Sequence, residues 1–323
     1  MVKYALRRIL ETIPTTIGIL LLSFVLFNVV GGSPAQVILG KSATKESIAA
    51  FNHKWGYDKP LLIGELRGHG VEKLRSALDS QFFKFVGDLC KGDFGYSLEH
   101  QEPVIEVLKR GVGPSLSLTV PILLGGVALG LMLAMFAAAC RGRFVDRVIL
   151  VGSTVLMSVN YVIWVLGGQF FLSYKAGFFP VWGYRNAFYL VLPVMIGILS
   201  SLGTDIRFFR TALLDEIYRP YVLTARSKGL STATILLRHV LRNALIPIVT
   251  YVSLSIPYLF TGSLLLESFF GIPGLGSVSI NAIHSADMAI VRTVVVLGAL
   301  VYQFVNLATD LLYAALDPRV RMG

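Results

Sequence analysis

The residues best suited to chemistry in this sequence lie between Tyr221 and Pro247, in the phrase YVLTARSKGLSTATILLRHVLRNALIP. Guanidinium and ammonium groups such as those of Arg226 and Lys228 can form charge-assisted bonds with carboxylates or with anionic lipid. No nucleophile and base can be paired from the sequence, and its His residues are few and scattered. The stretch therefore offers binding of an acidic partner, and we do not expect an enzyme.

Two short helices joined by a tight turn are predicted for this stretch. The Arg219-Pro220 step disfavours helix at Arg219 and suits Pro220 as the first residue of a new helix. Gly229 suits the left-handed position that ends a helix. Ser231 can cap the following helix, which should run toward Asn243. The pair is expected to lie roughly parallel to a membrane surface.

The first of these helices should have one apolar face. Tyr221, Val222 and Ala225 recur at spacings that place them on the same side. Arg226 and Lys228 can then reach water or a partner. An apolar ridge with basic flanks is what a docking element needs.

The elements that hold this stretch are predicted to be membrane-spanning helices. Of the 323 residues, 54% are hydrophobic, and the apolar runs are longer than a soluble core of this size needs. A helix crosses the hydrocarbon layer with about 20 residues, whereas a membrane barrel would show alternating segments of about ten. The sequence therefore predicts an all-α integral membrane protein. Its six expected spans are Ile9–Val30, Leu116–Ala139, Val148–Tyr174, Ala187–Ile206, Leu245–Glu267 and Ala289–Leu312.

Basic residues in the short connections set the expected orientation. Because cytoplasmic loops are enriched in Lys and Arg, both termini and the basic stretch are placed on the cytoplasmic side. The net charge of +10 then reflects topology and contact with membrane lipid, and it does not require nucleic acid. The residues that decide this are Lys3, Arg7, Arg8, Arg141, Arg143, Arg147, Arg207, Arg210, Arg219, Arg226, Lys228, Arg238, Arg242, Arg319 and Arg321.

Three regions are expected along the chain. Residues 1–30 comprise the cytoplasmic N-terminus and the first span. Residues 31–113 form an extracytoplasmic region with helix-like patterns near Lys45–His53 and Leu74–Leu89, and its recurring apolar residues favour a small folded cap. Residues 114–323 carry the other five spans and a cytoplasmic loop at about 207–243. Cys90 and Cys140 would lie on opposite sides of the membrane, which forbids a disulfide between them.

Three functions are open for the basic stretch when only its composition and spacing are considered. An amphipathic helix could lie on anionic lipid. The turn at Gly229 superficially resembles a DNA-reading helix-turn-helix, but both flanks run into membrane spans and leave no tether to reach a duplex. The third function is a mechanical coupling surface for a cytoplasmic motor subunit.

Several phrases of the sequence favour the third function because they occur together and in order. They are WGYDKPL after the first span, GDFGYSL followed by PVIEVL, PGLG in the fifth connection, and the closing NLATDLLYAALDPRV. The basic stretch itself contributes Tyr221, Thr224, Ala225, Arg226, Lys228 and Gly229, then His239, Arg242, Asn243 and Ala244. This stretch resembles the EAA-type cytoplasmic loop of ATP-binding-cassette (ABC) importer permeases of the dipeptide, oligopeptide and nickel group.

The resemblance implies a type I ABC importer permease (MetI-like) fold in the bacterial cytoplasmic (inner) membrane. It implies three kinds of partner: a second homologous permease in a heterodimer, two cytoplasmic ABC ATPases and an extracytoplasmic solute-binding protein. The helix of residues 220–231 would lie in a groove of an ATPase, where Gly229 lets two helices meet closely. The residues implied to couple this chain to the ATPase are Tyr221, Thr224, Ala225, Arg226, Lys228, Gly229, Leu230 and Ser231.

Two departures from the family pattern bear on the structure. Leu223 stands where the Glu of the EAA phrase is found in other members. Ser158-Val159-Asn160-Tyr161 stands where relatives usually have Ser-Ile-Pro, so no proline kink is expected in the third span. The chain also lacks a G-x-x-x-x-G-K-[ST] phosphate loop, so ATP and Mg are expected on partner subunits and no cofactor on this chain.

Polar side chains within the spans are candidates for the translocation path or for helix contacts, because they are costly in lipid. Asn306 and Asp310 share a helix face, and a structural ion pair is favoured for Asp310 near the cytoplasmic end. A mainly apolar path would tolerate varied peptides, and no cluster of acids for a dedicated cation site is visible. The candidates are Ser158, Asn160, Gln169, Asp205, Asn306 and Asp310.

The fifth connection, SFFGIPGLGSVSINAIHSADM, should form a tight external loop followed by a short helical piece. Gly271, Pro273 and the glycines after it break any helix there. His284 and Asp287 lie at helical spacing but are too few for a metal site, so a solvated pair is expected and no metal. The residues that could contact the binding protein are Pro273, Gly274, Leu275 and Gly276.

The function favoured by the sequence is that of a permease subunit importing dipeptides or oligopeptides by alternating access, driven by partner ATPases. One alternative is a permease of the same architecture for nickel or another small solute. A second alternative, from another class, is a membrane-anchored interaction protein that transports nothing.

Overall fold

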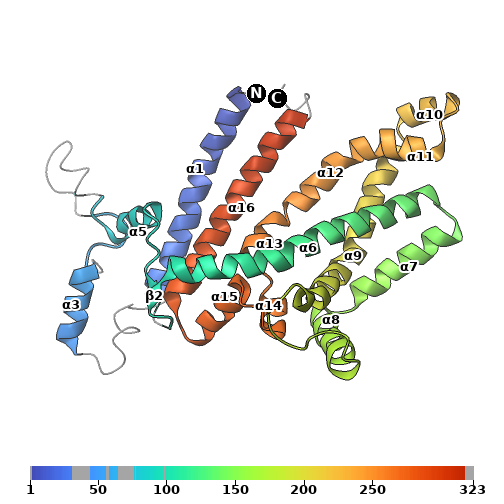
Figure 1. The fold of residues 1–323 in the computed structure, drawn as a ribbon. Helices are drawn as coiled ribbons and strands as arrows, with labels where there is room; N and C mark the ends of the chain where they lie inside the picture. Colours follow the sequence, from blue (N-terminus) through green and yellow to red (C-terminus); the bar gives the residue numbers. More distant parts are fainter. Residues whose placement is uncertain are drawn as a thin grey trace. The chain divides into compact units, whose positions relative to one another are not determined.

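The computed structural model is mostly helical (Figure 1) and describes residues 2–30, 44–55, 58–64, 76, 78–97 and 99–316. Within these ranges five unbroken helices are long and apolar enough to cross a membrane. Two further helix pairs pass the same test but bend sharply between their halves. The all-α prediction is confirmed, while the number of six spans remains a prediction. Arg319, Arg321 and the end of the closing phrase lie outside the described residues.

The long helices follow the hydrophobic runs and usually extend beyond them. The first span is α1 (Val2–Phe24), continued by a π-helical turn (Val25–Val30). The second, fourth and sixth spans are α6 (Val104–Ala139), α9 (Phe188–Ile217) and α16 (Met288–Leu316). The shorter elements between them are α3 (Lys45–Trp55), α5 (Gln81–Cys90), β1 (Tyr96–Ser97) and β2 (Glu102–Pro103).

The third predicted span is divided in two, which corrects the expectation of an unkinked helix. α7 (Phe144–Ser158) and α8 (Tyr161–Gly168), the latter continued by a π-helical segment (Gln169–Lys175), are bent by 88° relative to each other. Asn160 causes the break without proline, because it is extended and its side chain accepts a hydrogen bond from Val162 N at 2.9 Å. An Asn side chain at the N-cap favours the start of a new helix, and here it does so without proline.

The fifth predicted span, Leu245–Glu267, is also not one helix. The helix begins earlier, at α11 (Thr232–Thr234), and continues through a π-helical segment (Ile235–Val240) into α12 (Leu241–Ser253). It is followed by α13 (Ile256–Thr261) and α14 (Leu264–Phe270). Gly262, at φ +74°, separates these two because a right-handed helix cannot contain that conformation.

The chain forms two compact units. The first comprises Met1–Arg8, Arg110–Ile280 and Phe304–Gly323, and the second comprises Ile9–Lys109 and Asn281–Gln303. The expected external region therefore shares a unit with most of α1 and the first half of α16. The regional boundaries expected at residues 30 and 113 remain predictions.

The first unit has an apolar core where α6, α9 and α12 meet α10 (Pro220–Ser227). Phe209 and Leu213 of α9 are fully buried there with Val222 of α10 and Ile248 of α12. A second buried cluster joins α6, α8, α9 and α14, and it includes Leu118, Val165, Leu192, Ile196, Leu266, Phe270 and Ile272. The first cluster therefore holds the C-terminal half of α9 and the second holds its N-terminal half within the same unit.

A buried ion pair links the start of α7 to α9. Arg210 donates through Nε and Nη2 to both carboxylate oxygens of Asp146, each at 2.9 Å, and Gly142 N donates to the same carboxylate. The side chain of Arg210 is 16% exposed and that of Asp146 is 5% exposed. Nearby, a Cβ on Gly203 would lie 2.5 Å from the carbonyl oxygen of Ser153, so glycine permits the close approach of the two helices.

We expect Asp146→Ala to lower the stability of the protein. Arg210 would keep a buried charge without its carboxylate, which costs on the order of 2–3 kcal/mol. The loss can be measured as the temperature at which the detergent-purified protein ceases to be monodisperse on gel filtration. Glu106→Ala removes an exposed pair with Lys109 and should cost less than about 1 kcal/mol. Equal stability of the two variants would contradict the role given to the Asp146–Arg210 pair.

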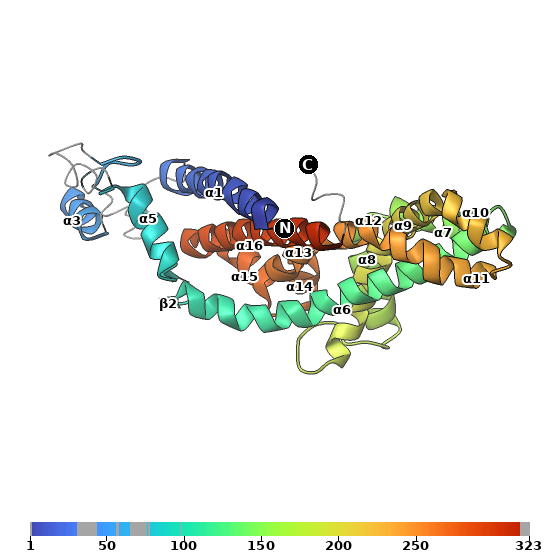
Figure 2. The same ribbon diagram turned by 90° about the horizontal axis from the view of Figure 1, so that it is seen from above.

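The second unit packs α1, α5 and α16 through aromatic rings. Phe24 of α1 and Val296 of α16 are fully buried with Phe82 and Phe85 of α5, and the rings of Phe24 and Phe82 meet edge to face at 5.5 Å. Farther along, Gln303 Nε2 donates to Thr15 Oγ1 at 2.8 Å, and α1 lies beside α16 in both Figure 1 and Figure 2. The second unit is therefore held by apolar contacts from three segments that are far apart in the sequence.

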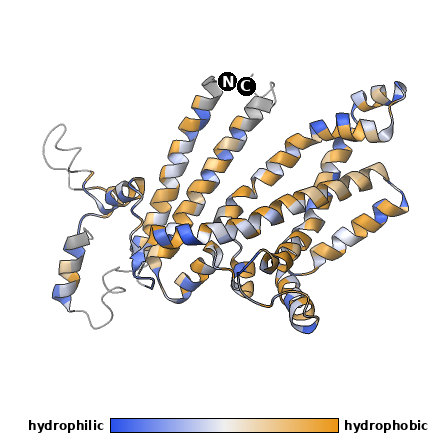
Figure 3. Cartoon of the chain, in the orientation of Figure 1, coloured by the Kyte–Doolittle hydropathy of each residue, from blue (hydrophilic) through white to orange (hydrophobic). Residues whose placement is uncertain are grey.

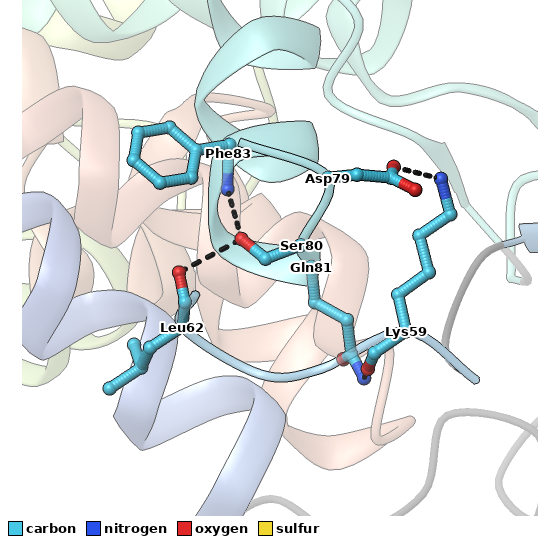
Figure 4. Close-up of polar contacts among 6 residues, drawn as sticks. All are labelled: Lys59, Leu62, Asp79, Ser80, Gln81 and Phe83. Atoms are coloured by element: carbon cyan, nitrogen blue, oxygen red, sulfur yellow. Dashed lines mark hydrogen bonds and ion pairs between the residues drawn. The ribbon is translucent and has the colours of Figure 1, made fainter. Parts of the chain in front are cut away.

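Polar contacts fix the start of α5 to the segment before it (Figure 4). Ser80 caps the helix by accepting from Phe83 N, and its hydroxyl donates to the carbonyl of Leu62 at 2.9 Å. Lys59 forms an ion pair with Asp79. The helix predicted for Leu74–Leu89 is thus confirmed only in its second half, since a capped helix begins at Gln81 and residues 74, 75 and 77 lie outside the described ones.

Asp287 corrects the expectation of a solvated His284–Asp287 pair. Its side chain is 1% exposed, and it accepts from Ser97 Oγ at 2.6 Å and from Glu99 N at 3.3 Å. His284 is exposed at the end of α15 (Leu275–His284). Asp287 therefore holds the β1–β2 turn to the start of α16 within the second unit.

Candidate functional site

The predicted basic elbow, defined as residues 219–234, has the local geometry that its sequence indicated. Pro220 occupies the first turn of α10, and Arg219 before it is extended. The helix ends at Ser227, and Gly229 follows with φ +77° while Leu230 N donates to the carbonyl of Ala225 at 3.3 Å. Ser231 caps the next helix by accepting from Thr234 N at 3.3 Å.

Two expectations about the elbow are corrected. The second helix is not a separate surface element, because it runs through Val240 into α12 without interruption. Gly229 is not required for close helix packing either, since a Cβ built there would meet no atom within 4 Å. Its positive φ is what requires glycine.

One face of α10 is firmly attached to the first unit. Val222 is 1% exposed and Ala225 is 7% exposed, and both belong to the core formed by α6, α9 and α12. Tyr221 packs against this core, and its hydroxyl donates to the Glu216 carboxylate at 2.6 Å. Burial and this hydrogen bond raise the pKa of Tyr221, so the phenol stays protonated and continues to donate. The predicted division between a buried face and an exposed one is confirmed.

The opposite face of the elbow is exposed and carries both apolar and basic groups. Leu223 is 63% exposed and Leu230 is 39% exposed. In the part of the chain that the structure describes, the exposed side chains of Arg226 and Lys228 make no ion pair. Hydrophilic residues gather around α10 while the long helices are mostly hydrophobic (Figure 3). The remaining predicted residues of this face, Thr224, Gly229 and Ser231, are also exposed.

Leu223 lies on this exposed face although it is not among the residues predicted from the sequence to couple the chain to an ATPase. It occupies the position at which the family phrase has Glu, and its exposure fits a contact with an apolar surface. Its place one residue after the buried Val222 is the signal that could have identified it, because neighbouring residues on a helix point about 100° apart.

A buried carboxylate organises the loop between α14 and α15, whose axes differ by 85°. Glu267 is 0% exposed and accepts from Ser115 Oγ at 2.8 Å and from Ser263 N at 3.0 Å. Its other oxygen accepts from Gly276 N at 2.7 Å and from Ser277 N at 3.1 Å. We call Glu267 with these four donors the loop cradle. It joins α6, α14 and α15.

The loop cradle buries three of the four residues expected to contact a binding protein, and that contact remains a prediction. Gly274, Leu275 and Gly276 are buried, and only Pro273 is exposed. A Cβ on Gly274 would lie 2.4 Å from both Glu267 Oε2 and Ser115 Oγ, so this glycine makes room for the carboxylate. The tight loop and the short helix after it are confirmed. Glu267 itself is expected from the sequence only as the end of a span, although its place four residues before the Gly271-Ile272-Pro273-Gly274 turn is a signal for it.

A cavity of about 340 Å³ lies within the first unit, between α6, α8, α9, α12, α13 and α14. Asp205 of α9 lines it and is 7% exposed, and Tyr251 of α12 donates to Asp205 Oδ1 at 2.9 Å. Tyr161 and Ser263 form a second polar contact in its wall, 3.2 Å apart. The rest of the lining is apolar, glycine or neutral hydroxyl: Thr119, Ile122, Leu123, Gly126, Val127, Gly197, Ser200, Ser201, Val252, Ser255, Leu259, Gly262 and Leu266.

The six polar residues proposed for the path or for helix contacts divide clearly. Only Asp205 lines the cavity. Asn160 caps α8, and Gln169 Nε2 donates to the carbonyls of Val181 and Phe269. Ser158 donates to a carbonyl of its own helix, and Asn306 is half-buried on α16. Asp310 forms the predicted structural ion pair, 3.5 Å from Arg8 Nη1.

Comparison with family models matches nearly the whole chain. Residues 126–322 match a family described as "Binding-protein-dependent transport system inner membrane component". Residues 1–119 match the corresponding N-terminal family, "Binding-prot-dependent transport system membrane comp, N-term".

Curated relatives are similar over their full length. The glutathione transport system permease protein GsiC of Salmonella typhimurium is 31% identical and covers 99% of both chains. A probable peptide ABC transporter permease protein, y4tP of Sinorhizobium fredii, is 30% identical over 98% of this chain and 99% of its own.

Among solved structures, an inward-facing form of the MetNI methionine ABC transporter matches with a TM-score of 0.54. The match has 19% sequence identity and covers 66% of this chain and 97% of the other. The likeness shows the fold, and it confirms the expected type I importer architecture.

Proposed function

This chain belongs to the family of binding-protein-dependent transport system inner membrane components, and we propose that it imports peptides as one of two permeases in its complex. Membership makes it the permease component of an ABC importer in a bacterial inner membrane. Peptides are favoured because the relatives named above are permeases for glutathione and for peptides. The observation that supports the proposal is the elbow, whose exposed face carries Leu223, Arg226 and Lys228 and would be available to a partner.

The sequence contains no phosphate loop for ATP, and the elbow exposes a basic face. We therefore expect this permease to act together with partner subunits. A second homologous permease would complete the translocation path as a heterodimer. Two cytoplasmic ABC ATPases would bind ATP and Mg, and this chain would carry no cofactor. A solute-binding protein would deliver the substrate from outside, where Pro273 is the exposed residue of the loop between α14 and α15.

The elbow can transmit force because its buried face packs into the core that adjoins the walls of the cavity. Its exposed groups, Leu223, Arg226 and Lys228, would sit in a groove of the ATPase with acidic groups opposite the cations. Val222 on the buried face packs in the core that also contacts Tyr251 and cavity residues of α6 and α12. A displacement of α10 would therefore move the helices that surround the cavity, which is what alternating access requires.

Import of nickel or another small solute is the second candidate, and the cavity disfavours nickel. A metal ion bound by protein needs several oxygen, nitrogen or sulfur ligands. Nowhere in the described ranges do three or more His, Cys, Asp or Glu side chains come together. A cavity with one carboxylate and mainly apolar walls suits a peptide better. A membrane-anchored protein without transport activity has no observation in its favour.

The proposal predicts that peptides will stimulate ATP hydrolysis by the assembled complex. The chain would be co-purified with its second permease and two ATPases and placed in liposomes with the binding protein. We expect trialanine to raise the rate of ATP hydrolysis and to accumulate inside the liposomes. The reason is that closure of the ATPases would move the elbow and, with it, the helices around the cavity. Stimulation by nickel or by an oligosaccharide, without stimulation by any peptide, would overturn the proposal.

A further inference from the structure

Within the described part of the chain, the cavity contains one carboxylate, Asp205, and no cationic side chain pairs with it. The two arginines that follow Asp205 on α9 are engaged elsewhere, since Arg207 donates to the hydroxyls of Ser153 and Thr154 and Arg210 pairs with Asp146. Among the residues whose side chains are described, no Lys or Arg forms an ion pair with Asp205. An acidic side chain in a membrane span is costly and commonly marks a binding site or a pathway.

Two aromatic contacts hold the ring of Tyr251 in place beside Asp205. The ring of Tyr251 stacks on Phe208 with centroids 4.3 Å apart and meets Phe209 edge to face at 5.8 Å. These contacts hold the Tyr251 hydroxyl toward Asp205 Oδ1. The second oxygen, Oδ2, lies near Gly126 of α6, where a Cβ would be 3.5 Å from it and 3.3 Å from Ser201 Oγ, and Ser201 also hydrogen-bonds to the carboxylate. Glycine at this position leaves space beside the carboxylate.

We propose that Asp205 binds the positively charged amino group of the transported peptide inside this cavity. This inference rests on the proposed function. An ammonium group has three donors and can bond to a carboxylate with a charge-assisted hydrogen bond, while the small and apolar walls accept varied side chains. The cavity volume of about 340 Å³ falls within the roughly 300–1,000 Å³ of ligand sites. The recognised class is therefore peptides with an unblocked amino terminus.

The test compares two peptides that differ only in the positive charge of the amino terminus. Equilibrium binding of radiolabelled trialanine and of N-acetyl-trialanine would be measured on the purified permease–ATPase complex in detergent, without binding protein. We expect the wild type to bind trialanine at least tenfold more tightly. In Asp205→Asn the two affinities should become equal because trialanine alone loses affinity.

Two controls separate recognition from a structural role of Asp205. Asp205→Glu keeps the carboxylate and should keep the preference for the unblocked peptide. Asp215→Asn removes an exposed carboxylate of the same helix that does not line the cavity, and it should also keep the preference. A merely structural Asp205 would weaken both probes equally in Asp205→Asn, and that result would overturn the inference.

ATP-driven uptake of trialanine by the same preparations separates this inference from the proposed function. Uptake by the wild type, together with an unchanged preference in Asp205→Asn, overturns the inference and leaves peptide import standing. Absence of peptide uptake by an active wild-type ATPase complex overturns peptide import and, with it, the inference.

Discussion

Replacing Glu267 with alanine is expected to reduce ATP-driven peptide uptake at least tenfold. The substitution leaves the buried donors of Ser115 and Gly276, and the partly buried N–H groups of Ser263 and Ser277, without their acceptor. Each unsatisfied buried group costs about 1–3 kcal/mol, so the loop between α14 and α15 cannot keep its observed conformation. Uptake into liposomes would be measured alongside limited proteolysis of the loop.

Glu267→Gln distinguishes the loss of volume from the loss of hydrogen bonding. The amide has nearly the shape of the carboxylate, but its NH₂ group would face neighbours that are themselves donors. We therefore expect this variant to resemble Glu267→Ala. Glu106→Gln, which changes an exposed carboxylate in the same way, should transport normally. A fully active Glu267→Gln protein with an unchanged proteolysis pattern would contradict the loop cradle.

Gly229→Val should uncouple ATP hydrolysis from transport while the protein still inserts and assembles. Gly229 has φ +77°, where a residue with a Cβ is strained by about 1–2 kcal/mol and a β-branched one by more. The turn would change conformation and the exposed face of α10 would lose its position relative to α11 and α12. We expect at least a tenfold fall in the peptide transported per ATP hydrolysed, measured in liposomes.

Gly229→Asn is the matched control for this prediction. Asn is close to Val in size but adopts the left-handed conformation readily. Space does not limit either side chain, since a Cβ at Gly229 has no neighbour within 4 Å. The Asn variant should therefore remain largely coupled. Similar behaviour of the two variants, whether both active or both inactive, would show that the positive φ of the turn is not what coupling depends on.

The sequence by itself determined the features that depend on neighbouring residues. Long apolar runs predicted the membrane-spanning helices, because a helix in lipid satisfies the hydrogen-bonding groups of its own backbone. Pro220, Gly229 and Ser231 predicted the elbow, since a first-turn proline, a left-handed glycine and a serine cap each act within one turn of chain. The buried and exposed faces of α10 followed from helical periodicity in the same way.

Only the tertiary structure decided which polar groups are brought together. Glu267 and Asp205 look alike in the sequence, as single acids in apolar segments. The first accepts from Ser115, 152 positions away, and from backbone donors of a loop that folds back on it. The second lines a cavity with Tyr251 of another helix. Burial of a charge depends on hydrogen-bond partners supplied by distant segments, and hydrophobic periodicity does not indicate which segments supply them.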